Sequence, residues 1–373
     1  MQFAKLPPVM DAVQSELGLD LIGAGFAVSI LGLVGILCAI STGAIVAAIG
    51  LRRSLVFAML SGAIFAAMGA AAPTAWLFLC SRLLEGFSHL VLVVCAPALM
   101  SQHAVERDKP IVLALWGCFF GLGFSILSAS APFIIHIGGW RGLMLGHAGL
   151  LLAIAGLIAF ALARSGSRDT PHAFPTLKML IDAHVSVYTS GAPLLLALTF
   201  GAYTILFLAN LTFLGRYLGE IRGWNHDSVG RFLSLVTLVC LVATLTAGAL
   251  VRAGVPLFAG LACAFGGLAL CAIGIFAAPV SDTQLIVLII GMMAMFGLLP
   301  GFVFANVPLI APTPDRAALT YGAIAQFGNV GTFLGTPLFA IAYKSAGWTG
   351  GALFVSLAAL VGIGLASRLR YTS

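Results

Sequence analysis

Long runs of apolar residues recur along nearly the whole chain, and they restrict its fold more than any other feature of the sequence. Each run has about 20 or more residues, enough for a helix to cross a hydrocarbon layer about 30 Å thick. Backbone amides in lipid must be satisfied within the protein, and runs this long do so as helices, whereas barrel strands would be short and alternating. The sequence therefore predicts an all-α integral membrane protein.

The charged residues are few, and most of the basic ones lie between the apolar runs. Hydrophobic residues make up 61% of the 373 residues and charged residues 8%, against about 25% charged in soluble domains. The net charge of +6 raises the question of a nucleic-acid partner, but the basic side chains are spread over the loops. We therefore expect a lipid bilayer, and no nucleic acid, as the partner of this chain.

Eleven membrane-spanning helices are expected, in two groups. The polar stretch 164–190 separates residues 1–163 from residues 191–373. This stretch is predicted to be a linker outside the membrane, with a short surface helix over 174–188. The spans are expected near 21–49, 54–72, 75–101, 110–136, 141–163, 193–217, 228–251, 255–278, 282–309, 316–344 and 348–368.

The two groups repeat several small motifs in the same order, which indicates an internal duplication. Two glycines stand at the same separation in one run of each group, the next run ends in Ala-Ala-Pro, and a later run carries GxxxG before a Gly-Trp pair. GxxxG allows close helix contact but is common in membrane helices. The matches are Gly25 and Gly43 with Gly230 and Gly248, Pro73 with Pro279, Gly117 and Gly121 with Gly331 and Gly335, and Gly139-Trp140 with Gly347-Trp348.

The first group has one run fewer than the second. Residues 1–10 are mostly apolar and carry a single charge, Lys5, and an acidic segment follows Pro8. We interpret these residues as the remainder of a first helix rather than a signal peptide, and expect about 10–15 residues to be missing before Met1. The two groups are then six-helix halves, residues 1–163 and 191–373.

The distribution of basic residues predicts the orientation, since Lys and Arg in short loops mark the cytoplasmic side. The linker and the C-terminus are then cytoplasmic, and the chain is a multi-pass protein of the cytoplasmic (inner) cell membrane. Loops on that side and the C-terminal tail carry Arg52, Arg53, Arg107, Lys109, Arg164, Arg168, Lys178, Arg252, Arg316, Arg368 and Arg370, against Arg141, Arg216, Arg222, Arg231 and Lys344 on the other.

Two six-helix halves joined by a cytoplasmic linker resemble the major facilitator superfamily. Between the second and third helices of that family a GxLaDRxGRR pattern is usual, and Gly43, Gly50, Arg52 and Arg53 match it. Its acidic residue and first arginine fall on Ala47-Ala48, so the charge contacts usual in this loop are not expected here. The resemblance implies that these residues form the conformational loop between the two helices.

A second family pattern, RxxQG, matches as Arg82-Leu-Leu-Glu85-Gly86, with glutamate in place of the family's glutamine. The glycine-proline pattern of the family's antiporters is not evident in 117–132. The resemblance implies a secondary active transporter, or permease, that works by alternating access, commonly as a monomer. The missing antiporter pattern leans away from a drug/proton antiporter, and we expect symport.

Arg82, Glu85 and His89 are the most informative residues, because a charge near mid-membrane costs at least about 2.5–3.5 kcal/mol unless it is partnered or faces water. Spacings of three and four place them on one helix face. We expect this stripe to face a central cavity, where Glu85 or His89 takes up a proton and Arg82 holds either the Glu85 carboxylate or an anionic substrate. The alternative is a fixed Arg82–Glu85 salt bridge near the end of the helix.

Lys5 and six neutral polar residues complete the candidate substrate and proton-coupling site. Lys5 either attracts an anionic substrate or extends to the outer surface. The polar residues of the second half either bind substrate or bond across helices as packing groups. They are Tyr203, Asn210, Asn306, Tyr321, Gln326 and Asn329.

A secondary transporter is the function that these patterns favour, with a small organic anion or amphipathic metabolite taken up with a proton. A drug or metabolite exporter and a non-transporting receptor or assembly protein stay open as alternatives. No P-loop, HExxH or GxSxG motif is present, so we expect no enzyme. The seven cysteines stand singly in apolar runs, and we expect neither a metal nor a cofactor.

Overall fold

The computed structural model describes residues 2–103, 105, 116, 119–164, 173–189, 191–311 and 314–369. Over these residues the chain forms helices and no strand, as predicted. The elements are η1 (Pro7–Val9), α1 (Met10–Leu17), α2 (Leu21–Ser29), α3 (Leu31–Ile49), α4 (Leu51–Ala70), α5 (Ala75–His103), α7 (Phe119–Arg164), α8 (Leu177–Tyr188), α9 (Gly191–Arg222), α10 (His226–Arg252), α11 (Leu257–Phe276), α12 (Asp282–Ile310) and α13 (Pro314–Leu369).

Nine stretches within the described residues are long and apolar enough to cross a membrane. Two of them, in α7 and α13, are broken at Gly139 and Gly347, where φ is 59° in both cases. Glycine adopts this left-handed conformation without the steric cost that a Cβ brings. The nine stretches therefore overlap all eleven expected spans, and the two Gly-Trp pairs mark equivalent breaks in the two halves.

The start of the first half and the start of the second half also share a local structure. Gly18 follows α1 and Gly223 follows α9, each with φ at 68°. Two residues later Asp20 and Asn225 cap the next helix, each side chain accepting a hydrogen bond from the backbone N–H three positions on. Such caps satisfy donors that a helix start leaves open. The segment η1–α1, which precedes α2, is therefore equivalent to the last part of α9, which precedes α10.

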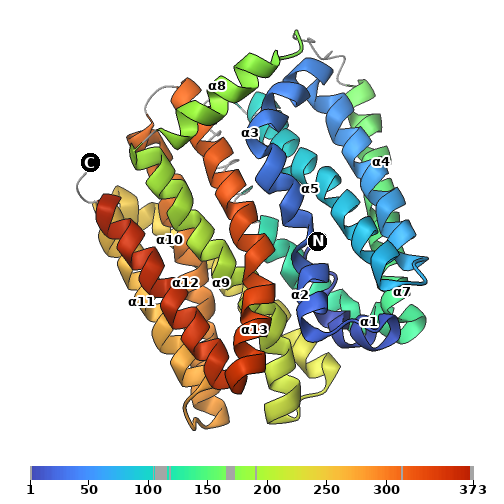
Figure 1. Cartoon of the computed structure of the whole chain (residues 1–373), viewed down its shortest axis with the longest axis vertical. Coiled ribbons are helices and arrows are strands. Elements are labelled where there is room, and N and C mark those ends of the chain that lie inside the picture. The colour runs from blue at the N-terminus through green and yellow to red at the C-terminus, as the bar shows by residue number, and fades with distance from the viewer. Residues whose placement is uncertain are drawn as a thin grey trace.

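The helices form two groups that stand side by side (Figure 1). In the first group, coloured blue to green, α4 packs against α5 and α7, and α3 packs against α5. In the second group, α13 packs against α9 and α11, and α12 packs against α10 and α11. The helix α8 crosses one end of the molecule, the end at which α3 turns into α4 (Figure 1), and we call this the linker end.

The two groups touch through a small number of helices. The helices α2 and α3 pack against α13, α7 packs against α10, and η1 packs against α9. The first of these contacts is close: a Cβ at Gly32 would lie 2.8 Å from the carbonyl oxygen of Asn329, and a Cβ at Gly35 would overlap the Asn329 side chain. Small residues permit this approach. The contact between α3 and α13 is therefore specific in shape.

The GxxxG pair of α13 forms the closest part of its contact with α9. A Cβ at Gly331 would overlap Thr204 Oγ1 and the carbonyl of Gly201, and a Cβ at Gly335 would overlap the carbonyl of Ile205. The other expected pair includes Gly117, which lies outside the described residues. In the second half, the predicted close helix contact is present.

We expect Gly331→Val to destabilise the protein by at least about 1–3 kcal/mol, because the added side chain must push α9 and α13 apart. The apparent melting temperature in detergent is the measurement. Gly364→Val is the matched control on the same element, since a Cβ at Gly364 has no heavy atom within 4 Å. Equal melting temperatures for the two variants would contradict the close contact.

Candidate functional site

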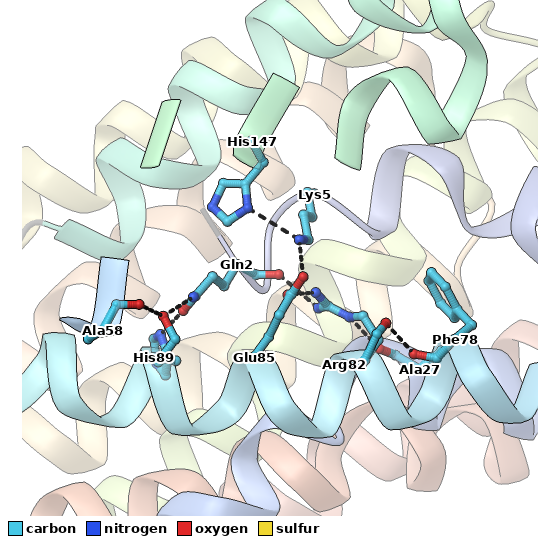
Figure 2. A network of polar contacts seen from close by, with 11 residues as sticks. Gln2, Lys5, Ala27, Ala58, Phe78, Arg82, Glu85, His89 and His147 are labelled. Carbon is cyan, nitrogen blue, oxygen red and sulfur yellow. Dashed lines mark hydrogen bonds and ion pairs between the residues drawn. The ribbon is translucent and has the colours of Figure 1, made fainter. Parts of the chain in front are cut away.

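Three charged side chains meet inside the first half, at the junction of α5 with the segment that precedes η1 (Figure 2). Lys5 Nζ lies 2.6 Å from Glu85 Oε1, and Arg82 forms an ion pair with Glu85 Oε2. The exposed fractions of these side chains are 0% for Lys5 and Arg82 and 1% for Glu85. We call Lys5, Arg82 and Glu85 the charged cluster.

The other hydrogen bonds of Arg82 go to backbone carbonyls. Its Nε donates to Ala27 O at 3.2 Å and its Nη2 donates to Gln2 O at 2.8 Å. A buried guanidinium needs partners of this kind, because an unpaired charge in a low-dielectric interior is costly. Arg82 therefore fastens α2 and the N-terminal segment to α5.

His147, on the part of α7 that follows Gly139, is the third partner of the cluster. Lys5 Nζ lies 3.2 Å from His147 Nδ1, and His147 is 5% exposed. A lysine ammonium can only donate, so Nδ1 is the acceptor, and the ring proton of a neutral His147 is on Nε2. Figure 2 shows Lys5 between this ring and Glu85.

A second layer of polar groups adjoins the cluster. Gln2 Nε2 donates to Ser88 Oγ at 3.0 Å, and Ser88 Oγ donates to Ala58 O at 2.6 Å. Gln2 Oε1 lies 3.0 Å from His89 Nδ1, which is therefore a donor. The predicted stripe of Arg82, Glu85 and His89 is thus one connected network, with His89 joined through Gln2.

Among the residues that the structure describes, the hydrogen-bond and ion-pair partners of the charged cluster all belong to the first half. The network connects the N-terminal segment, α2, α4, α5 and α7. The sequence left two positions open for Lys5, and its full burial excludes an extended side chain at the surface. The expected orientation of the stripe, towards a cavity shared with the second half, has no counterpart in these contacts.

The cluster carries one positive charge more than it can neutralise internally. Lys5 and Arg82 bring two cations and Glu85 one carboxylate, and His147 accepts as a neutral ring. In an interior of low dielectric constant such a surplus is far more costly than in water. A bound anion or the loss of one proton would remove it.

Three of the predicted polar residues in the second half bond to their own helices. Asn210, Asn306 and Asn329 each donate to the carbonyl four residues earlier, at 2.8, 2.8 and 2.7 Å. Amides that bond in this way satisfy one donor locally. These contacts fit the packing interpretation, and they bring none of the three to the charged cluster.

Gln326 is the predicted residue that crosses between the halves. Its Nε2 donates to Ile36 O on α3 at 2.7 Å, and its Oε1 accepts from Tyr188 Oη at 3.1 Å. Tyr188 is the last residue of α8, the predicted surface helix of the linker. The three residues therefore tie α8, α13 and α3 together.

The two predicted tyrosines lie among phenylalanines. Tyr203 is buried with its ring centroid 5.3 Å from Phe200 and 5.5 Å from Phe207. Tyr321 is 41% exposed and stacks on Phe304 at 6.3 Å. This aromatic group lies on α9, α12 and α13, and it is separate from the charged cluster.

The conformational-loop residues lie at the linker end, where α3 becomes α4. Gly50 alone separates the two helices, with φ at 102°, a value that favours glycine. Arg52 and Arg53 begin α4, and a Cβ at Gly43 would have no heavy atom within 4 Å. Gly50 therefore makes a tight turn between α3 and α4, and a conformational role for the four residues stays a prediction.

Sequence reasoning missed Gln2 and His147. Gln2 stands three residues before Lys5, a spacing that could have indicated a shared site. His147 stands in an apolar run with no acidic or basic residue within one helical turn after it, so no local signal distinguishes it from a packed histidine. Its role depends on how α7 packs against the N-terminal segment.

Comparison with known families agrees with this architecture. The family model of the Major Facilitator Superfamily matches residues 1–336. A search of curated proteins finds no significant match. Since the family match covers most of an all-helical, membrane-spanning chain, the protein belongs to the Major Facilitator Superfamily of secondary transporters.

Proposed function

We propose that the protein carries a small organic anion together with a proton by alternating access. The observation that carries this proposal is the charged cluster, in which Lys5 and Arg82 outnumber Glu85 at full burial. We propose that the transport path runs past this cluster during the transport cycle, because the cation surplus would attract an anion there. The same surplus favours release of a proton once that anion has left.

The charge of the cluster would couple transport of the anion to transport of a proton. With an anion of charge −1 nearby, the protonated cluster of charge +1 is neutralised. Without the anion, the cluster reaches neutrality by losing one proton. Each of the mixed states has an unbalanced charge in a low-dielectric medium and is disfavoured. Anion and proton therefore cross together, which makes the transporter a symporter.

The contacts between the two halves are the ones that would open and close during transport. The helix pairs α3–α13 and α7–α10 join the halves, and Gln326 with Tyr188 adds a tie near α8. Alternating access requires such contacts to open on one side at a time. We further propose that the linker end is cytoplasmic, because it carries Arg52 and Arg53, and that the protein takes up its substrate as a monomer in the cell membrane.

The test uses the full chain in lipid vesicles that enclose a pH-sensitive dye. Lactate, pyruvate and gluconate are added outside as probe monoanions, and lactamide is the uncharged control of the same shape as lactate. We expect at least one anion to acidify the interior faster than in vesicles without protein. Absence of acidification and of labelled uptake with any of the three would contradict the proposed substrate class and favour a non-transporting receptor.

One further expectation follows from the charge balance. A proton and a monoanion together carry no net charge, so clamping the membrane potential should leave the initial rate unchanged. An anion moving alone would gain or lose about 2.3 kcal/mol of driving force for each 100 mV. The measurement is the acidification rate at two potassium gradients with valinomycin. A strong dependence on potential would contradict one-to-one coupling.

A further inference from the structure

Two of the three charges in the cluster are poor candidates for the proton that the transporter carries. Arg82 stays protonated, because a guanidinium does not lose its proton in proteins. Glu85 accepts a cation on each oxygen, from Lys5 at Oε1 and from Arg82 at Oε2. A proton added to Glu85 would displace one of these bonds and raise the charge of the cluster from +1 to +2. Lys5 is the group whose proton loss makes the cluster neutral.

We propose that Lys5 carries the transported proton and that His147 accepts it. This inference rests on the proposed function and names the groups that perform its proton step. Lys5 Nζ lies 3.2 Å from His147 Nδ1, within the range over which a proton can transfer. His147 sits on α7, opposite the carboxylate side of Lys5 (Figure 2), so the ammonium lies between its counterion and its acceptor.

The proton balance needs no reagent other than water, which accepts the released proton. The N–H bond of Lys5 that points at His147 breaks, and a new N–H bond forms at Nδ1. The imidazolium then releases the proton on Nε2 to water. The products are a neutral Lys5 amine and a neutral His147 that carries its proton on Nδ1, which now donates to Nζ. One proton has left, and the cluster retains only the balanced pair of Arg82 and Glu85.

The groups around Lys5 define what can influence this step. Among the described residues, the charged and titratable groups facing it are Glu85 and Arg82 from α5 and His147 from α7. The carboxylate of Glu85 attracts the charged lysine, whereas the guanidinium of Arg82 on the same carboxylate repels it. Within the described residues, His89 is joined to the charged cluster through its contact with Gln2. A passing anion adds a second carboxylate-like charge and shifts the balance towards protonated Lys5.

The test needs no substrate. The full-length protein in detergent is labelled with ¹³C at lysine Cε and with ¹⁵N in the histidine rings, and both are followed by NMR across the pH range in which it stays folded. Signals of Lys5 and His147 are assigned by their absence in Lys5→Met and His147→Asn. We expect Lys5 to lose its proton while His147 Nδ1 changes, in the same titration, from unprotonated to protonated.

The expected proton loss at Lys5 and the expected tautomer change at His147 are tested separately. A Lys5 signal that stays charged throughout would overturn the inference, and a Lys5 that titrates while the His147 tautomer stays constant would remove His147 from the proton step. If Lys5→Met does not fold, Lys5→Arg provides the assignment while keeping the cation beside Glu85. Lys178 and His184 on α8 serve as internal references in the same spectra.

A transport measurement separates this inference from the proposed function. His147→Asn keeps a hydrogen-bond acceptor near the Nδ1 position but cannot take up a proton. We expect it to lose probe-driven acidification while His184→Asn retains it. Coupled flux that survives in His147→Asn would sink the inference alone. Normal titration of both groups in a wild type that moves none of the probe anions would sink the substrate proposal alone.

Discussion

Replacing Glu85 by glutamine is expected to destabilise the protein by about 3–5 kcal/mol, because it leaves two buried cations without a counterion. Lys5 and Arg82 are fully buried and both point at this one carboxylate. Glutamine has nearly the same volume, so the loss is one of charge and not of packing. Equilibrium unfolding in mixed detergent micelles measures the effect, and we expect probe transport to disappear as well.

Glu220→Gln is the control for this prediction. Glu220 also pairs with an arginine, Arg216, at 2.6 Å, but the two side chains are 37% and 21% exposed. Partly solvated pairs of this kind contribute about 0–1 kcal/mol. Similar losses of stability in the two variants would mean that Glu85 is not the counterion of a desolvated cluster.

The helices of this fold could be predicted from the sequence because each apolar run is itself the local cause of its helix. The break in α7 is also visible, since Gly139 precedes a tryptophan as Gly347 does in α13. The packing between the two halves is harder to predict from the sequence. Gly32 and Gly35 look like ordinary small residues until α3 meets Asn329.

The candidate site was predictable as far as it lies on one helix. Arg82 and Glu85 share a face because they are three residues apart, and that relation needs no tertiary information. The choice between a surface and a buried Lys5 does need it, because its partner Glu85 lies 80 positions away along the chain. His147 is 142 positions from Lys5. Pairings at such distances depend on how η1, α5 and α7 pack.

Lys5→Met is expected to leave stability unchanged or raise it, and to abolish coupled proton movement. Methionine fills a volume similar to that of lysine, and the remaining Arg82–Glu85 pair is neutral. Replacing a buried charge by an apolar residue is often neutral or stabilising by about 1–4 kcal/mol. The variant therefore separates folding from function, with unfolding in mixed micelles and acidification by the probe anions as the two measurements.

The double variant Lys5→Met/Glu85→Gln measures the interaction energy between Lys5 and Glu85. In the wild type, Glu85→Gln leaves two buried cations, Lys5 and Arg82, without a counterion. In the Lys5→Met background it leaves only Arg82 without one. The cost of Glu85→Gln should therefore fall in that background by a coupling energy of about 0.5–3 kcal/mol, the range measured for groups in contact. Additive effects would show that Lys5 and Glu85 do not interact, and would remove the electrostatic basis of the proposed coupling. A measured coupling energy together with lost proton movement in Lys5→Met would place the surplus charge on Lys5.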